Sequence, residues 1–259
     1  MRLAALAALV AAFVVEGCVA PSEQSLTIAT YNIRHGRGMD GRVDLARTAA
    51  ALRALDADII GLQEVDRAVE RSGRSAQAAE LGQRLGMEHA FGAFMPYQGG
   101  EYGMAILSRH PMRRIHEIPL PVGNEPRVAL LVELEVAPGR RIVAVNVHFD
   151  WVADDAFRFA QAEALAAVLD TISLPVLLLG DFNDEPTSRT MERWQTRFLT
   201  VDKPAADRFT FPSTQPEKEI DHILLGPRSA WTATTGRVVT DSLSSDHRAF
   251  VATVTLAAP

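Results

Sequence analysis

Hydrophobic residues recur along this chain with two periods, one typical of strands and one typical of helices. Strand-like segments are short apolar runs bounded by glycine, proline or charged residues. They cover residues 26–33, 58–62, 105–107, 128–136, 141–149, 175–179, 220–225 and 250–256. Helical spacing is found over residues 43–55, 75–85 and 154–170. Strands and helices therefore alternate, which predicts an α/β fold.

Each predicted helix has features that fix its ends or its buried face. Asp44 is placed to cap the first turn of the first helix, and Gly86 is suited to end the second. The first helix should bury Leu45, Ala49, Leu52 and Leu55. The third should bury Phe157, Ala160, Ala164, Leu165 and Val168. The helices thus offer apolar faces that can pack against a sheet.

Two features of the strands indicate mixed sheets rather than one parallel sheet. The strands over residues 128–136 and 141–149 are joined by Pro138-Gly139, which predicts an antiparallel hairpin. Residues 176–179 are apolar at every position, which requires cover on both faces of their sheet. We expect two mixed sheets packed face to face, with the helices outside.

Length and composition fit one large globular domain. The chain has 259 residues, of which 47% are hydrophobic, so a substantial core is available. The net charge of −6 argues against a broad nucleic-acid surface, although carboxylates gathered at a metal site would lower the charge by themselves. The sequence has no Walker loop, dinucleotide fingerprint, zinc-binding cysteine–histidine spacing or nucleophile elbow.

The first 25 residues predict export rather than a part of the fold. Met1-Arg2 precedes an apolar run over residues 3–15, which is too short to cross a bilayer and typical of a secretory signal. Cys18, the single cysteine, follows closely and favours a lipoprotein signal, with plain secretion and a buried helix as alternatives. We expect residues 26–259 to form a domain that is secreted or held at the periplasmic face of a membrane by lipidated Cys18.

Polar residues gather where the predicted strands end. The clusters are Tyr31-Asn32, Gln63-Glu64, Gly180-Asp181-Phe182-Asn183 and Ser245-Asp246-His247. A carboxylate at the end of a buried strand is costly unless it is paired or bound to a metal. Carboxylates and amides favour Mg²⁺, Mn²⁺ or Ca²⁺ over zinc. The clusters therefore predict a hard-cation site with a general base beside it.

Two pairs of residues share a strand face by their spacing. Asp181 and Asn183 are two apart, so on extended chain their side chains point to the same side and can hold water or a phosphate oxygen. A polar turn is the alternative for this pair. Asn146 and His148 have the same spacing, which favours contact with a phosphate group.

Asp221 stands at the entrance of another strand, where it can orient a histidine and stabilise its charged form. His247 is the natural partner, and a solvated strand end is the alternative for Asp221.

Seven motifs follow one another along the chain. They are Thr30-Tyr31-Asn32, Leu62-Gln63-Glu64-Val65, Tyr102-Gly103-Met104-Ala105-Ile106-Leu107-Ser108, Asn146-Val147-His148, Gly180-Asp181-Phe182-Asn183, Ile220-Asp221-His222-Ile223 and Ser245-Asp246-His247. In this order they resemble the endonuclease/exonuclease/phosphatase superfamily over residues 26–257. The resemblance implies a four-layer α/β sandwich and a divalent-metal phosphoester hydrolase.

The resemblance also implies a role for each matched residue. The metal and phosphate environment would be Asn32, Glu64 and Asp246, with Mg²⁺ or Mn²⁺ as the ion. Water and phosphate would be oriented by Asp181 and Asn183. Asp221 and His247 would form an acid–histidine dyad, and His148 would bind phosphate. Arg127 and Asn146 would contact the substrate.

The sequence leaves the substrate open. An exported, anchored and acidic protein favours the phosphodiester of a lipid or sugar-phosphate head group, because a lipid anchor would bring the site near a membrane. A nuclease and a non-catalytic binding domain are the alternatives. Arginines that could line a nucleic-acid groove are Arg34, Arg37, Arg42, Arg71 and Arg74. We expect a monomer that binds a phosphoester.

Overall fold

The computed structural model describes residues 23–233 and 236–258. Within them, one sheet consists of β1 (Gln24–Asn32), β2 (Ile59–Arg67), β3 (Glu88–Tyr97), β4 (Gly100–Ser108), β11 (Trp231–Ala233), β12 (Arg237–Val238) and β13 (Phe250–Leu256). The other sheet consists of β5 (Met112–Pro119), β6 (Val128–Ala137), β7 (Arg140–His148), β8 (Val176–Asp181), β9 (Leu199–Thr200) and β10 (Asp221–Gly226). Both sheets mix parallel and antiparallel pairs.

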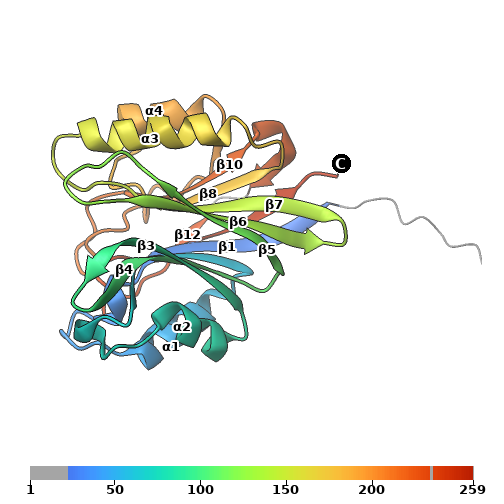
Figure 1. Ribbon diagram of the computed structural model, residues 1–259. Coiled ribbons are helices and arrows are strands. Elements are labelled where there is room, and N and C mark those ends of the chain that lie inside the picture. Colours follow the sequence, from blue (N-terminus) through green and yellow to red (C-terminus); the bar gives the residue numbers. More distant parts are fainter. Residues whose placement is uncertain (1–22, 234–235, 259) are drawn as a thin grey trace, which may run out of the picture.

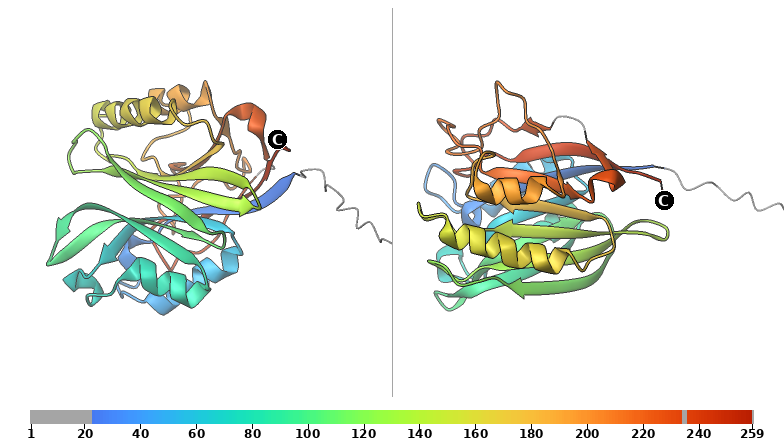
Figure 2. Two further views of the ribbon diagram at one scale, coloured as in Figure 1. Left: turned by 45° about the vertical axis from the view of Figure 1, so that its right-hand side comes forward. Right: turned by 90° about the horizontal axis from the view of Figure 1, so that it is seen from above.

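The helices cover the outer faces of the two sheets (Figures 1 and 2). The first sheet is covered by α1 (Leu45–Leu55) and α2 (Gln77–Leu85), and the second by α3 (Ala156–Leu169) and α4 (Arg189–Gln195). The short 3-10 helices are η1 (Arg34–Gly36), η2 (Glu70–Ser72) and η3 (Arg228–Ala230). The layers run helix, sheet, sheet, helix, so the predicted four-layer α/β sandwich is confirmed.

Three apolar layers hold these elements together. The layer between the sheets includes Ile28, Met104, Leu130, Leu179 and Phe250. A second layer lies under α3 and α4, and a third lies under α1 and α2, where the predicted face of α1 is buried. The Asp44 carboxylate accepts a hydrogen bond from the Arg47 amide at 2.9 Å, which confirms the predicted N-cap.

One parallel strand pair in each sheet determines where the polar clusters lie. β1 pairs with β2 through the crossover that contains α1, and β7 pairs with β8 through the crossover that contains α3. Parallel neighbours end at the same edge of a sheet, where binding sites of α/β proteins are found. Asn32 ends β1, and His148 is opposite Asp181 at the ends of β7 and β8. The antiparallel β10 places Asp221 opposite Asp181 as well.

Several elements differ from the sequence pattern. β2 does not end at Leu62 but continues to Arg67 through a bulge between Gln63 and Val65. The pattern did not predict β3, β5 or α4. β5 is an edge strand that exposes Arg113 and Arg114, and such polar edges carry no apolar alternation.

The predicted buried face of α3 was right for Leu165 and wrong for the other residues, of which Ala160 is exposed and Ala164 and Val168 are half-buried. Phe157 is exposed, and the apolar residues that are buried are Ala162, Leu165, Ala166 and Leu169. Arg158 and Gln161 share this inner face, where they donate to the carbonyls of Asp150 and Pro121. These two buried polar residues interrupt the hydrophobic period and shift the face that it predicts.

The start of the domain lies slightly earlier than the predicted boundary at residue 26, because β1 begins at Gln24. Cys18 and the predicted signal lie outside the described residues. In the part of the chain that the structure describes, every helix is too short or too polar to cross a membrane.

Candidate active site

A cleft of about 460 Å³ opens where the two parallel strand pairs end. Its walls are Asn32, Glu64, Tyr102, Glu125, Arg127, His148, Trp151, Asp181, Asn183, Phe211, Lys218, Ile220, Asp246 and His247. Another open hollow, of about 530 Å³, is lined by Lys203 and Glu219, which are bonded to each other at 3.0 Å. The smaller cleft gathers most of the polar residues that the sequence predicts, so we assign the chemistry to it.

The bulge in β2 aims Glu64 into the cleft. Glu64 has a positive φ of 57°, so the chain turns at this residue. The side chains of Gln63 and Glu64 therefore point into different parts of the protein. The Gln63 amide is buried between the sheets, where it donates to Asn146 Oδ1 at 2.7 Å. Glu64 Oε1 accepts a hydrogen bond from Asn32 Nδ2 at 3.1 Å. Burial raises the pKa of Glu64, and the charge of Asp246 raises it further, against the Asn32 hydrogen bond.

Asp181 is the centre of the site. Its Oδ2 accepts a hydrogen bond from Asn32 Nδ2 at 3.1 Å, and it lies 3.5 Å from His148 Nε2 and 3.6 Å from His247 Nε2. Its Oδ1 accepts from the backbone amide of Asn183 at 3.0 Å. Burial raises the pKa of Asp181 to about 7, and Asp221 adds to this effect while His247 opposes it. A carboxylate with such a pKa can take a proton near neutral pH.

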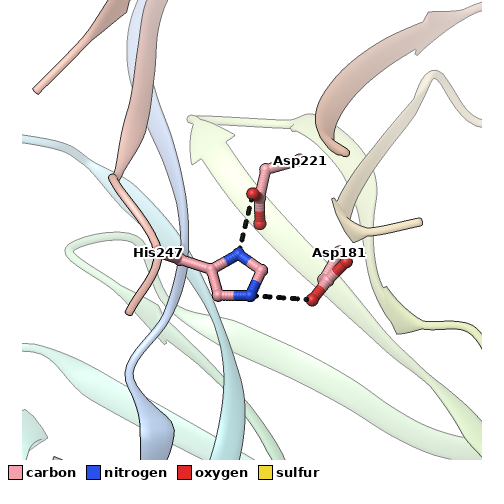
Figure 3. Close-up of side chains that lie close together, drawn as sticks. All are labelled: Asp181, Asp221 and His247. Carbon is pink, nitrogen blue, oxygen red and sulfur yellow. Dashed lines mark hydrogen bonds and ion pairs between the residues drawn. The ribbon is translucent and has the colours of Figure 1, made fainter. Parts of the chain in front are cut away.

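Asp221, His247 and Asp181 form a chain of three groups (Figure 3). The Nδ1 side of the His247 ring lies 3.0 Å from Asp221 Oδ2, and the Nε2 side faces Asp181. Burial alone would lower the pKa of His247, but Asp221 and Asp181 outweigh it and raise the pKa to about 10. The imidazole is therefore charged at neutral pH and carries a proton on both nitrogens, of which Nδ1 donates to Asp221.

His148 and Arg127 supply two further donors. Burial lowers the pKa of His148 well below its usual value, and the charges of Arg127 and His247 lower it further, so this imidazole is neutral. Arg127 is buried, pairs with Glu125 at 3.0 Å and lies 5.0 Å over the Phe94 ring. Its Nε and Nη1 are buried without a hydrogen-bond partner among the described residues. A buried guanidinium with unused N–H groups at a cleft wall is suited to bind a phosphate oxygen.

Asn183 and Asp246 both reach the cleft, Asp246 from the segment just before β13, and Asn183 by a route that the spacing did not predict. Asn183 has a φ of 51° and follows the end of β8, so a turn rather than strand alternation places it beside Asp181. Its Nδ2 donates to the Phe149 carbonyl at 3.0 Å. Asp246 Oδ2 pairs with Arg34 Nε at 3.2 Å. The following residue, His247, turns inward to the dyad.

Asn146 does not line the cleft. It is fully buried between the sheets, where its Nδ2 donates to the carbonyls of Leu62 and Ala105, both at 2.9 Å. Its Oδ1 is taken by Gln63, so the whole amide is used to join the two sheets. The spacing in Asn146-Val147-His148 placed both side chains on the inner face correctly, but only His148 lies far enough along β7 to reach the site.

Six cleft residues had no predicted role in the sequence analysis: Tyr102, Glu125, Trp151, Phe211, Lys218 and Ile220. The Phe211 ring lies 4.8 Å from the His247 ring, and the Lys218 ammonium lies 6.0 Å from the Phe211 ring. Phe211 and Lys218 come from the long segment before β10, which has no periodic pattern. Trp151 was detectable, because it lies three residues after His148.

Two sets of ligands for a divalent metal can be tested against this geometry. Oxygen or nitrogen atoms of Asp181, Asp221 and His247 lie within 4.8 Å of one another. However, the imidazole separates the two carboxylates and uses opposite nitrogens for them, which suits a proton relay better than a metal. The charge of Asp246 helps to raise the pKa of Glu64 in the same cleft, so these two carboxylates would supply oxygen ligands to a hard cation there. Asn32 adds an amide to this set.

The sandwich and its cleft indicate a phosphoester hydrolase, and the comparisons agree. The chain belongs to the Endonuclease/Exonuclease/phosphatase family, whose model matches residues 29–247. Members of this family are metal-dependent phosphoesterases, nucleases or phosphatases.

Individual relatives extend this likeness. The uncharacterized protein YbhP of Escherichia coli K12 is 30% identical over 172 residues, which are 62% of this chain and 67% of that protein. An endonuclease/exonuclease/phosphatase structure from Beutenbergia cavernae has a TM-score of 0.73 and 25% identity, covering 91% of this chain and 73% of the other. The mannosyl-6-phosphatase Bt3783 of Bacteroides thetaiotaomicron has a TM-score of 0.70 and 19% identity, covering 88% and 99%.

Proposed function

We propose that this protein is a divalent-metal-dependent phosphodiesterase that acts on a lipid or sugar-phosphate head group by direct attack of water. The observation that supports it most is the position of Asp181 Oδ2. This oxygen lies beside Asn32 and between His148 and His247, in a cleft where Arg127 has unused N–H groups. The cleft thus brings together a base in Asp181, a neutral donor in His148, a charged donor in His247 and a guanidinium in Arg127 that can bind phosphate.

The proposed reaction needs no covalent intermediate. A water oxygen bonds to phosphorus, the bond from phosphorus to the leaving alkoxide breaks, and the alkoxide takes a proton from solvent water, so the products are a phosphomonoester and an alcohol. Asp181 accepts the water proton, for which its pKa of about 7 is suited, and Asn183 helps to position the water. Arg127, His148 and charged His247 stabilise the oxygens on which negative charge develops. Asp221 acts through His247, because it fixes the orientation and the charge of the ring.

The metal would be held by Glu64, Asp246 and Asn32, with Mg²⁺ or Mn²⁺ as the ion. When bound, such an ion polarises the phosphoryl group and stabilises the leaving oxygen. The chain contributes the oxygen ligands and their burial. Charge repulsion between Glu64 and Asp246 in the free cleft supports the assignment, since a bound cation would relieve it.

A small head group is favoured over a nucleic acid by the charges near the cleft. None of Arg34, Arg37, Arg42, Arg71 and Arg74 is among the cleft walls. Arg34 pairs with Asp246, and Arg71 is held by both oxygens of Asp66. A polynucleotide needs a cationic path for its backbone, which these paired arginines do not offer. The likeness to a mannosyl-6-phosphatase is consistent with a sugar-phosphate head group.

A screen of purified protein tests the proposed function. Phospholipids, inositol phosphates, hexose phosphates, simple phosphodiesters and DNA are each incubated with Mg²⁺ or Mn²⁺, and released phosphate or alcohol is measured. The matched control is Asp181→Asn, which keeps the shape of the side chain and removes the base. Turnover that persists in this variant, or that is confined to DNA, would contradict the proposal.

The cellular location is part of the same proposal. We expect an exported protein, anchored through Cys18 or secreted, that acts as a monomer. The support is the sequence pattern of residues 1–18, which lie outside the described residues.

A further inference from the structure

Trp151 stands out in the cleft wall, because it is a large apolar side chain in polar surroundings. Its exposed fraction is 58%, whereas Trp194 and Trp231 are 1% and 3% exposed. Trp151 shares the cleft with Asn183, Lys218 and Glu125. A large apolar side chain left in water at the mouth of a binding cleft is typical of a ligand contact.

The backbone that carries Trp151 is fixed from three directions. The Asp150 amide donates to Gln161 Oε1 at 2.9 Å, and the Asp150 carbonyl accepts from Arg158 Nη1 at 3.2 Å. The Asp150 carboxylate accepts from the Asn124 amide at 2.6 Å. Gly123 permits this approach, because a Cβ there would lie 2.3 Å from Asp150 Oδ2. Trp151 is thus exposed but stands on a rigid loop, so little ordering is required when a ligand packs on it.

We propose that Trp151 is a stacking platform for a six-membered polyol ring in the leaving group of the substrate. This inference rests on the proposed function, since it places the ring next to the phosphate site of the same cleft. The C–H bonds on one face of such a ring can pack on an indole, and its hydroxyls need amide, carboxylate and ammonium partners.

The charges of the cleft favour a polyol over a nucleobase. Asn183, Glu125 and Lys218 lie in the same walls as Trp151 and offer acceptors and donors to hydroxyl groups. A nucleobase would bring a ribose-phosphate chain that needs further cations, and Arg34 is already paired with Asp246. A hexose phosphate and an inositol phosphate share the ring chemistry, so both are tested as sources of the ligand.

The exposure of the three tryptophans provides a binding measurement that needs no turnover. Because Trp194 and Trp231 are buried, acrylamide should quench mainly Trp151 in the wild-type protein. With Mg²⁺ present, we expect a hexose 6-phosphate or inositol 1-phosphate to protect this emission. Glycerol 3-phosphate, whose binding is verified by calorimetry, should protect it much less, because it has the phosphate but no ring. Trp151→Phe should remove the quenchable emission.

Kinetics give a second, independent measurement. Trp151→Ala should lower kcat/KM for ring esters by about tenfold and for glycerol esters by less than about twofold, since aromatic stacking contributes on this scale. Trp151→Phe should retain most of the ring preference. Val122→Ala, in a neighbouring loop, removes another exposed apolar side chain, lies outside the cleft and is the matched control.

The outcomes separate the two proposals. If ring phosphates protect the Trp151 emission from acrylamide but no ester is hydrolysed, the stacking role of Trp151 is supported and the proposed function is rejected. Hydrolysis with equal losses for ring and glycerol esters in Trp151→Ala would reject the platform alone. Stronger protection by a nucleoside 5′-monophosphate than by either polyol would overturn the assignment of the ring.

Discussion

Replacement of Asp221 by Asn is the sharpest test of the assigned roles, because it removes one charge and keeps the shape. Asp221 is fully buried, and its Oδ2 lies 3.0 Å from His247 Nδ1. Its charge is a main cause of the raised pKa of His247, and it also helps to raise the pKa of Asp181. Asp221→Asn should therefore lower both pKa values, and His247 should lose its fixed orientation and part of its charge.

The size of the effect follows from these contacts. A misplaced or uncharged His247 should lower kcat by about 10²- to 10⁴-fold, the range of one acid–base group. The charge-assisted hydrogen bond contributes about 1.5–3 kcal/mol to stability. Relief of the repulsion between Asp181 and Asp221 offsets part of this loss, so we expect the free energy of unfolding to fall by about 1–2 kcal/mol. The variant should fold and bind metal but turn over slowly.

The assay is kcat at saturating metal, together with urea unfolding of the same preparation. Asp66→Asn is the matched control, because Asp66 is also fully buried and is held by Arg71 at 2.8 and 2.9 Å, outside the cleft. It should lose comparable stability while its kcat stays within about twofold of wild type. A value of kcat within about threefold of wild type in Asp221→Asn would refute the role given to the Asp221–His247 dyad.

Four further predictions concern the base chemistry, the metal, pH and the anchor. His247→Ala should lower kcat by at least ~10²-fold without unfolding the protein, and a near-normal rate would remove His247 from the mechanism. EDTA should abolish turnover, and Mg²⁺ or Mn²⁺ should restore it; full activity after exhaustive chelation would refute the metal requirement. In a calorimetric titration, Glu64→Gln should raise the dissociation constant of the metal by about tenfold. Without metal, the free energy of unfolding should fall as pH rises from 6.5 towards 9, because the pKa of His247 is about 10 in the folded protein and 6.5 is its ordinary value. Urea titrations at several pH values should show a smaller fall in Asp221→Asn. An equal fall in the wild type and the variant would be evidence against the raised pKa of His247. Cys18→Ser should release the protein from the membrane fraction, and mass spectrometry of the mature wild type should find a lipidated cysteine rather than a terminus beyond residue 18.

The sequence predicts the sandwich well because its inner strands are apolar on both faces. β8 and β10, for example, are buried along their whole length, and their apolar runs show in the sequence. β5 is invisible to the same pattern, since an exposed edge strand needs charged residues and not alternation. The buried face of α3 was misplaced, because Arg158 and Gln161 look polar in sequence but are buried and donate to loop carbonyls.

The site was predictable where a residue ends a parallel strand, as Asn32, His148 and Asp181 do. Glu64 and Asn183 were also predicted as site residues and do line the cleft, but the backbone that places them was not predictable, because it departs from strand geometry. The positive φ of Glu64 and Asn183 determines where these side chains point, and no spacing rule contains that information. Asn146 shows the opposite error, since its spacing is right but its amide is used to join the sheets. Phe211 and Lys218 come from irregular chain, whose course depends on tertiary packing.

The direction of β1 has a consequence for any membrane tether. β1 starts at Gln24, next to Leu256 of β13, and ends at Asn32 in the cleft. The eight residue steps between them span about 26 Å, because a strand rises about 3.3 Å per residue. The start of β1 and the end of β13 therefore lie at the end of the sandwich away from the cleft. In Figure 1 the blue start of β1 and the C-terminus are on the right-hand side. An enzyme tethered through residues before Gln24 would carry its cleft at the end of the sandwich opposite the tether. Of the two proposed kinds of substrate, a soluble sugar-phosphate ester would therefore reach the cleft more readily than a lipid head group of the same bilayer.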